Sequence, residues 1–201
     1  MPSPYIAKKV WPDYILNGAT FSFTHLAEAY FTAHDSLGHE KQIIVTYQDH
    51  VFTRDAVEGE TLKDAFPGAN RDPFGVFCPV RYRWSLRLPQ IIALLPEQRI
   101  WNLRKDDRYA HVPVVAENGE TILYSIVFSI EPVKRNIAYD FWIRVRTAYP
   151  CDGPPPDTFG DVRFSHLLMV RERGKHPPRN YSPHRKTPKT AASQSSDPTE
   201  E

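Results

Sequence analysis

The chain has 201 residues, which is enough for one domain with a hydrophobic core and a tail. With 41% hydrophobic and 24% charged residues, its composition is that of an ordinary soluble protein. The formal net charge of +1 excludes a strongly basic protein, so a nucleic-acid site would need local clusters of arginine.

The first third of the chain contains one clear strand. Residues 1–18 are proline-flanked and predict an irregular segment across the core edge. Residues 21–26 predict a short strand, and residues 26–34 predict one or two helical turns. Residues 41–52 alternate between faces and predict a strand. One face holds Ile43, Val45, Tyr47 and Val51, and the other holds Gln42, Thr46, Gln48 and His50.

A long loop separates this strand from a second patterned segment. Residues 54–72 are polar, contain glycine and proline, and predict a loop of the length that is often functional. Residues 80–88 alternate and predict a strand, with Arg81, Arg83 and Arg87 on one face. Residues 89–95 fit a single helical turn, and residues 100–103 predict another strand.

The strongest local signal is a β-hairpin. Residues 112–116 and 121–130 are apolar runs, and Glu117-Asn118-Gly119-Glu120 separates them. Asn-Gly between two apolar runs favours a tight hairpin turn.

The next strand, residues 140–150, has the sequence DFWIRVRTAYP. Strict alternation places Trp142, Arg144 and Arg146 on one face. Thr147 and Tyr149 would then share the apolar face with Phe141, Ile143 and Val145. Either a bulge before Thr147 turns these two residues to the arginine face, or they are core and edge residues.

The end of the chain changes character. Residues 151–160 contain three consecutive prolines and predict irregular structure, and residues 162–171 predict a last strand or a short helix. From residue 174 onward proline, serine and lysine dominate, which is typical of a disordered tail. We therefore expect a single α+β domain over 1–173, with a mainly antiparallel β-sheet and a few short helices, and a disordered tail over 174–201.

Two arginine clusters are candidates for phosphate binding. Arg81, Arg83 and Arg87 share one predicted strand face, and Arg144 and Arg146 share another. Guanidinium groups match phosphate oxygens in a bidentate fashion. The alternative is a solvated sheet face whose arginines pair with acidic side chains on neighbouring strands.

His50 is the candidate acid or base, because it lies between a strand and a long loop, with Thr53 and Arg54 close behind. The alternative is a histidine that only ends a strand. The other histidines lack metal-ligand spacing, and the sequence has no HExxH, GxSxG, CxxC or glycine-rich phosphate motif. We expect no metal and no cofactor.

Cys78 and Cys151 have neither metal nor redox spacing, and two free thiols are the expectation, although the two could also meet in the fold. No charged-then-apolar leader opens the chain, and no apolar run approaches the ~20 residues that cross a bilayer. We expect a cytoplasmic protein without a membrane partner, or one delivered by a route that needs no classical signal.

The Arg-Thr-Ala-Tyr-Pro segment at 146–150 resembles the late-strand motif of the barnase–EndoU–colicin–RelE-like RNase superfamily. The similarity extends over roughly 43–150, and the His-Val-Phe-Thr segment resembles an element of short phage- and plasmid-borne proteins. The resemblance implies an antiparallel sheet with helices on one side and metal-independent RNA cleavage. Thr147 and Tyr149 match the motif, Arg146 precedes it, and His50 matches only the looser element. The chain departs from the pattern by lacking an amphipathic N-terminal helix pair.

These observations lead to the hypothesis of a metal-independent endoribonuclease of toxin or phage-effector type, in which the RNA 2′-hydroxyl is the nucleophile. His50 would act as acid or base, Arg144 and Arg146 with help from Arg83 would stabilise the phosphorane, and Thr147 and Tyr149 would orient the phosphate or donate a proton. The expected substrate-binding residues are Arg54, Arg81, Arg83, Arg87, Trp84 and Trp142. RNA, or another single-stranded nucleic acid, and a cognate inhibitor protein are the expected partners.

Two alternatives use the same arginine and aromatic side chains without catalysis. One is a module that binds single-stranded nucleic acid. The other is a protein-interaction module that inhibits a host or phage complex.

Overall fold

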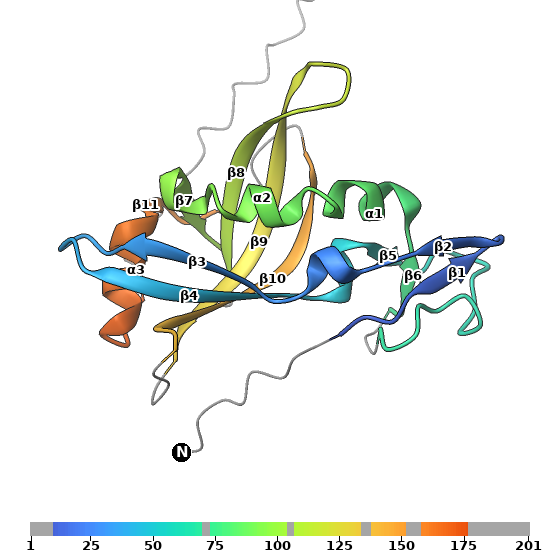
Figure 1. Ribbon diagram of the computed structural model, residues 1–201, viewed down its shortest axis with the longest axis horizontal. Coiled ribbons are helices and arrows are strands. Elements are labelled where there is room, and N and C mark those ends of the chain that lie inside the picture. Colours follow the sequence, from blue (N-terminus) through green and yellow to red (C-terminus); the bar gives the residue numbers. More distant parts are fainter. Residues whose placement is uncertain (1–9, 70–72, 104–106, 134–137, 152–157, 177–201) are drawn as a thin grey trace, which may run out of the picture.

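The computed structural model describes residues 10–69, 73–103, 107–133, 138–151 and 158–176. Over these residues, seven strands form a mixed sheet in the order β11-β7-β8-β9-β10-β4-β3, accompanied by three short α-helices (Figure 1). Neighbouring strands of this sheet are antiparallel except for β10 and β4, which run parallel. The expected α+β class, with a mainly antiparallel sheet, is therefore confirmed.

The strands of the main sheet are β3 (Ala29–His34), β4 (Glu40–Tyr47), β7 (Arg99–Asn102), β8 (Arg108–Val115), β9 (Thr121–Pro132), β10 (Phe141–Pro150) and β11 (Asp161–Arg163). Two small antiparallel pairs are β1 (Tyr14–Leu16) with β2 (Ala19–Phe21), and β5 (Thr53–Asp55) with β6 (Gly75–Phe77). The helices are α1 (Pro79–Ser85), α2 (Leu88–Ile92) and α3 (Phe164–Glu172), and short 3-10 turns are η1 (Thr24–Leu26), η2 (Asp49–Val51) and η3 (Leu95–Glu97).

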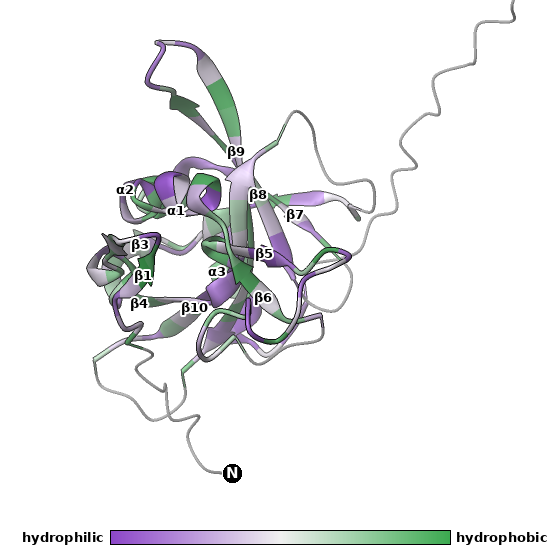
Figure 2. Ribbon diagram, turned by 90° about the vertical axis from the view of Figure 1, so that its right-hand side faces the viewer, coloured by the Kyte–Doolittle hydropathy of each residue, from purple (hydrophilic) through white to green (hydrophobic). Residues whose placement is uncertain are grey.

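The predicted hairpin is confirmed as β8 and β9. Ala116 donates its backbone N–H to the carbonyl of Glu120 at 2.8 Å, and Gly119 has a φ of 84°, a left-handed conformation that glycine adopts without strain. The hairpin rises clear of the rest of the molecule, with hydrophobic segments below a hydrophilic tip (Figure 2). Strand predictions are also confirmed for β10, for β7, and for β4 as far as Tyr47, after which the chain forms η2.

The strand predicted over 80–88 is wrong, because these residues form α1 and the start of α2. Pro79 and Pro89 each occupy a first-turn helix position, where a fixed φ and a missing N–H favour helix initiation. The residues that reach the core are Ser85, Leu88, Ile91 and Ile92, which follow a helical spacing of three and four. Arg81, Arg83 and Arg87 consequently do not share a strand face.

Three further segments, residues 21–26, 26–34 and 162–171, can be compared with the sequence predictions. The helical turns expected over 26–34 are wrong from residue 29 onward, where β3 places Phe31 and Ala33 toward the core and Tyr30 and His34 outward. The short strand expected over 21–26 is confirmed only at Phe21, because Thr24–Leu26 is η1. The open choice for 162–171 resolves as a helix, α3, which directly follows the short β11.

One hydrophobic core joins the sheet and the helices. α2 crosses in front of β8 and β9, and α1 continues the same layer beside β10 (Figure 1). Phe128 and Phe141 are fully buried in the sheet, and α3 adds Phe164, Leu167 and Leu168 to the same core. Cys78 and Cys151 form no disulfide bond. The tail predicted over 174–201 lies outside the described residues from residue 177 onward, and the division into domain and tail stays a prediction.

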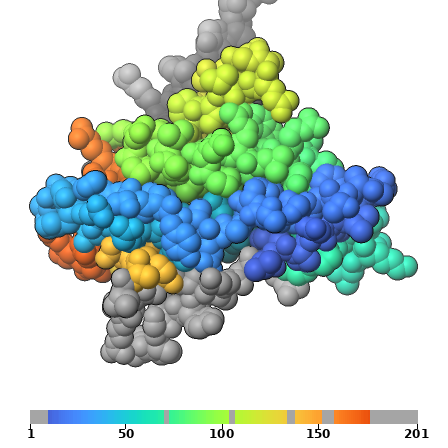
Figure 3. Space-filling view, in the orientation of Figure 1, coloured from blue at the N-terminus to red at the C-terminus, as the bar shows by residue number. Residues whose placement is uncertain are grey.

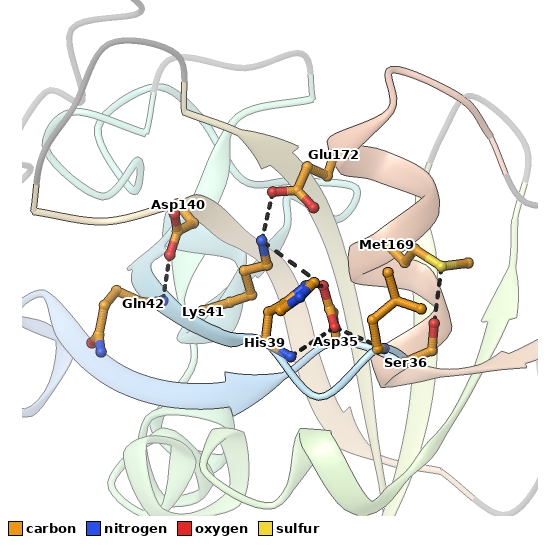
Figure 4. Close-up of polar contacts among 9 residues, drawn as sticks. Asp35, Ser36, His39, Lys41, Gln42, Asp140, Met169 and Glu172 are labelled. Atoms are coloured by element: carbon orange, nitrogen blue, oxygen red, sulfur yellow. Dashed lines mark hydrogen bonds and ion pairs between the residues drawn. The ribbon is translucent and has the colours of Figure 1, made fainter.

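A buried carboxylate fixes the turn between β3 and β4 (Figure 4). Asp35 is 4% exposed and accepts hydrogen bonds from the backbone N–H groups of Leu37 and His39 and from the His39 imidazole. Lys41 lies 3.9 Å from the same carboxylate and 2.5 Å from Glu172 at the end of α3. This network ties the turn to α3. Burial alone would raise the pKa of Asp35, but the bonds from His39 and Leu37 lower it below its ordinary value of 3.8.

Replacing Asp35 by asparagine should therefore destabilise the fold in a pH-dependent way. A carboxyl whose pKa is lower in the folded chain stabilises the fold above its ordinary pKa, and this contribution is lost as pH falls through the folded pKa. We expect Asp35→Asn to lower the urea midpoint at pH 7 and the gap from the native chain to close below pH 3.8. Asp13→Asn, at an exposed site, is the control. A gap that persists in acid would contradict the assignment.

Candidate functional site

A β-bulge determines which side chains of β10 face outward. The register between β10 and β9 shifts between Val145 and Thr147, so Arg146 is an extra residue in β10. Val145 before the bulge and Ala148 after it are both fully buried. Thr147 and Tyr149 therefore lie on the outer face with Trp142 and Arg144, and the bulge alternative is confirmed.

The bulge coincides with the point at which β4 leaves β10. Tyr47 pairs with Val145, and the backbone N–H of Gln48 donates to the Val145 carbonyl at 2.9 Å. The chain then turns into η2, which packs against β10. His50 is consequently brought to Thr147, although 97 residues separate them in the sequence.

Four of the residues predicted for the site gather there. The Nη1 atom of Arg81 donates to the carbonyls of His50 and Thr53 at 3.0 and 2.9 Å, and its guanidinium carbon lies 5.2 Å from the centre of the Tyr149 ring. The Thr147 hydroxyl donates to the His50 carbonyl at 3.4 Å. We call His50, Arg81, Thr147 and Tyr149 the β10-end cluster.

Within this cluster, an acidic side chain accompanies the imidazole. His50 Nε2 lies 3.8 Å from Asp55 Oδ1, and the two side chains are 30% and 53% exposed. The pair is an ion pair whenever the imidazole is protonated. The imidazole is therefore partly exposed beside a carboxylate, whereas Arg81 and Thr147 contact the backbone carbonyl of His50.

The other predicted arginines of this region are paired with carboxylates. Arg54 forms two hydrogen bonds with Glu60, and this interaction lowers the pKa of Glu60 to about 2. Arg146 lies 2.6 Å from Asp107. These contacts match the alternative reading of a sheet face whose arginines have acidic neighbours.

Arg144 and Trp142 form a separate group on the outer face. The Arg144 guanidinium lies 4.5 Å from the centre of the indole and 3.5 Å from Glu131. The indole N–H of Trp142 donates to the Thr46 hydroxyl at 2.8 Å. Both side chains are therefore held in place by neighbours on β4, β9 and β10.

Arg83, Trp84 and Arg87 lie elsewhere, in a pocket between α1 and the β8–β9 hairpin. They do not join the β10-end cluster, although Arg81 lies on the same helix. The arginines of the two predicted clusters, together with Arg54, therefore lie in three separate places.

Sequence reasoning missed a polar group beside Tyr149. Ser125 on β9 lies opposite Tyr149 on β10 and opposite His111 on β8. The Tyr109 hydroxyl hydrogen-bonds Ser125 at 2.9 Å and also bonds His111. Burial raises the pKa of Tyr109 to about 12, so this phenol keeps its proton at neutral pH. The period-two spacing of Tyr109 and His111 in β8 was the available signal.

The described residues contain no group of three or more histidine, cysteine, aspartate or glutamate side chains that could hold a metal ion. None of the helices in the described part of the chain is long and apolar enough to cross a membrane.

Arg81 should be worth much more to stability than its helix neighbour Arg83. Arg81→Met removes two hydrogen bonds and the contact with the Tyr149 ring, so we expect a loss of about 2 kcal/mol in unfolding free energy. Arg83 is exposed and bonds no described residue. Arg83→Met should therefore change stability by less than about 0.5 kcal/mol. Urea denaturation measures both, and equal losses would contradict the anchoring role of Arg81.

Comparison with known proteins gives one positive result. No curated protein and no solved structure matches the chain. The sequence model of the YjaZ family matches residues 13–171, which include all the described helices and strands up to the last turn of α3. The chain belongs to the YjaZ family.

Proposed function

We propose that the protein is a metal-independent endoribonuclease whose active site is the β10-end cluster. The observation that carries the proposal is the convergence of His50, Arg81, Thr147 and Tyr149 from η2, α1 and β10. Cleavage by the RNA 2′-hydroxyl needs a base, an acid and a cation, because the substrate supplies its own nucleophile, and an imidazole, a phenol and a guanidinium can fill these roles.

In this mechanism each group has a separate role. His50 accepts the proton of the 2′-hydroxyl as its oxygen attacks phosphorus, and the bond from phosphorus to the 5′-oxygen breaks. The phenol of Tyr149 donates a proton to the departing 5′-oxygen, which leaves a 2′,3′-cyclic phosphate and a 5′-hydroxyl. Arg81 stabilises the negative charge that develops on the phosphorane oxygens, and two backbone carbonyls fix its guanidinium beforehand.

Thr147 is a positioning residue in this proposal. Its hydroxyl bonds the backbone carbonyl of His50 and so holds η2 against β10. Arg144 and Arg146 are assigned to RNA binding at the edge of the site instead of to stabilising the phosphorane, because Glu131 and Asp107 compensate their charges. Partly exposed ion pairs of this kind contribute only about 0–1 kcal/mol, so an RNA phosphate can replace the carboxylate at little cost.

The test is incubation of single-stranded RNA with the protein in EDTA, with analysis of the product ends. We expect 2′,3′-cyclic phosphate ends and a rate that His50→Ala lowers by ~10²–10⁴. The substitution leaves the hydrogen bonds from Arg81 and Thr147 intact, because both end on the His50 backbone. His34→Ala, at an exposed position of β3, is the matched control and should cleave normally. Intact RNA with the native protein, or an unchanged rate for His50→Ala, would remove the proposed mechanism.

The Arg144 and Trp142 side chains on the outer face favour a second candidate, a module that binds single-stranded nucleic acid without cleaving it. It predicts a gel shift for both RNA and DNA that weakens as salt rises, with the strands left intact. Cleavage in the same tubes would exclude it.

The setting of this activity is part of the proposal. The resemblance at 146–150 supports a toxin or phage effector that has a cognate inhibitor protein. The composition of the chain supports action in the cytoplasm without a membrane partner. Purification of the chain with an acidic protein that blocks RNA cleavage would support this setting.

A further inference from the structure

A pocket of about 360 Å³ lies between α1 and the turn of the β8–β9 hairpin, away from the β10-end cluster. Figure 3 shows the hairpin standing above the layer formed by the helices. Its lining residues are Arg83, Trp84, Arg87, Ala116, Glu117, Asn118, Glu120 and Ile122. We propose that this pocket binds a nucleoside phosphate, with the base against Trp84, the phosphate on Arg83 and Arg87, and the amino edge of the base toward Glu117.

The two walls of the pocket carry opposite charges. The helix wall presents Arg83 and Arg87, and the hairpin wall presents Glu117 and Glu120. Among the described residues, none of these four side chains forms an ion pair across the pocket. The walls are therefore too far apart to neutralise each other directly, and a ligand that is negative at one end and a hydrogen-bond donor at the other would join them.

The arginines of the helix wall are available to bind an anion. Arg83 bonds no described residue, and the guanidinium of Arg87 rests 5.8 Å from the centre of the Trp84 ring. Guanidinium groups without a carboxylate partner bind phosphate in a bidentate geometry. In this respect they differ from Arg54, Arg144 and Arg146, each of which already has an acidic partner.

The middle of the pocket is apolar and aromatic. Trp84 and Ile122 line it, and the Trp84 ring packs 5.9 Å from that of Tyr124. Tyr124 is fully buried and is not among the lining residues. A planar ring on the indole gains stacking energy and excludes water.

The hairpin wall selects the kind of base. The Glu120 carboxylate accepts a hydrogen bond from Asn118 at 2.7 Å, whereas Glu117 has no partner among the described residues. A free carboxylate accepts hydrogen bonds from exocyclic amino groups such as that of cytosine. Inorganic phosphate offers nothing to the indole or to this wall. The volume is within the range of small-ligand sites, ~300–1,000 Å³.

This inference does not depend on RNA cleavage, since binding needs neither His50 nor Arg81. The same chemistry has two sources, a free nucleotide and a nucleotide within a single RNA strand. Titration calorimetry distinguishes these two sources. The ligands are CMP, UMP, inorganic phosphate and a 2′-O-methyl tetranucleotide of cytidine, which cannot be cleaved by 2′-hydroxyl attack.

We expect CMP to bind saturably and UMP to bind about tenfold more weakly, because uracil carries an oxygen in place of the amino group. Arg83→Gln with Arg87→Gln should weaken CMP binding by at least about tenfold, and Trp84→Leu should weaken it as well. Arg173→Gln, at an exposed arginine just after α3, is the matched control and should bind normally. A thermal melt of each variant checks that the fold is retained.

A site that accepts free nucleotides is supported if both CMP and the tetranucleotide bind and if Arg83→Gln with Arg87→Gln weakens the binding of both. Binding of the tetranucleotide alone, with the same sensitivity, supports a subsite for one nucleotide of a strand. No saturable binding of either, equal weakening by Arg173→Gln, or phosphate binding as tight as CMP binding would overturn the inference. Each result leaves the test of RNA cleavage by His50 untouched.

Discussion

The outer face of the sheet depends on one irregularity, the β-bulge at Arg146. Side chains alternate strictly along a strand, so one extra residue exchanges the faces of everything that follows it. Without the bulge, Thr147 and Tyr149 would point toward the core, and the small Ala148 would point outward. The bulge is tolerated because β4 leaves β10 at Val145, so no third strand needs a regular hydrogen-bond ladder beyond that point.

Charge pairing is the second constraint on the site. Arg54, Arg144 and Arg146 each have a carboxylate within 4 Å, and the chain as a whole is nearly neutral. Such a surface produces little long-range attraction for a polyanion. Recognition would have to rely on short-range contacts from guanidinium groups that have no acidic partner among the described residues, such as Arg81, Arg83 and Arg87. All three lie on or directly after α1, which makes this helix the common support of the β10-end cluster and the pocket.

Local patterns predicted the sheet well and the helices poorly. The Asn-Gly turn and the alternation of 141–145 each reflect an interaction between near neighbours and are confirmed, whereas strict alternation fails after the bulge at Arg146. Residues 80–88 alternate as a strand would, yet Pro79 and Pro89 start helices there, and burial follows Ser85, Leu88 and Ile92. Alternation over nine residues is compatible with a helix when the arginines can extend to solvent.

The candidate site could be predicted only in part, for a related reason. The residue types at 50, 147 and 149 indicated RNA cleavage with a histidine and a tyrosine. The sequence also indicated that a bulge is needed to turn residues 147 and 149 to the outer face. Acidic partners for the arginines were stated as an alternative, but Asp107 and Glu131 could not be identified, because they reach the arginines through the register of β8, β9 and β10. The role of Arg81 likewise follows from a helix that the alternating pattern concealed.

The single parallel pairing of the sheet also has a kinetic consequence. β8, β9 and β10 follow one another through short connections and can assemble as a local meander, whereas β4 must cross about a hundred residues of chain to reach β10. Pairings over such separations form late, because the entropy of closing the intervening loop is lost before any contact compensates for it. η2 and His50 follow directly after β4, so they reach β10 only when this long-range pairing forms. We therefore expect the β10-end cluster to assemble after the β8–β9–β10 meander.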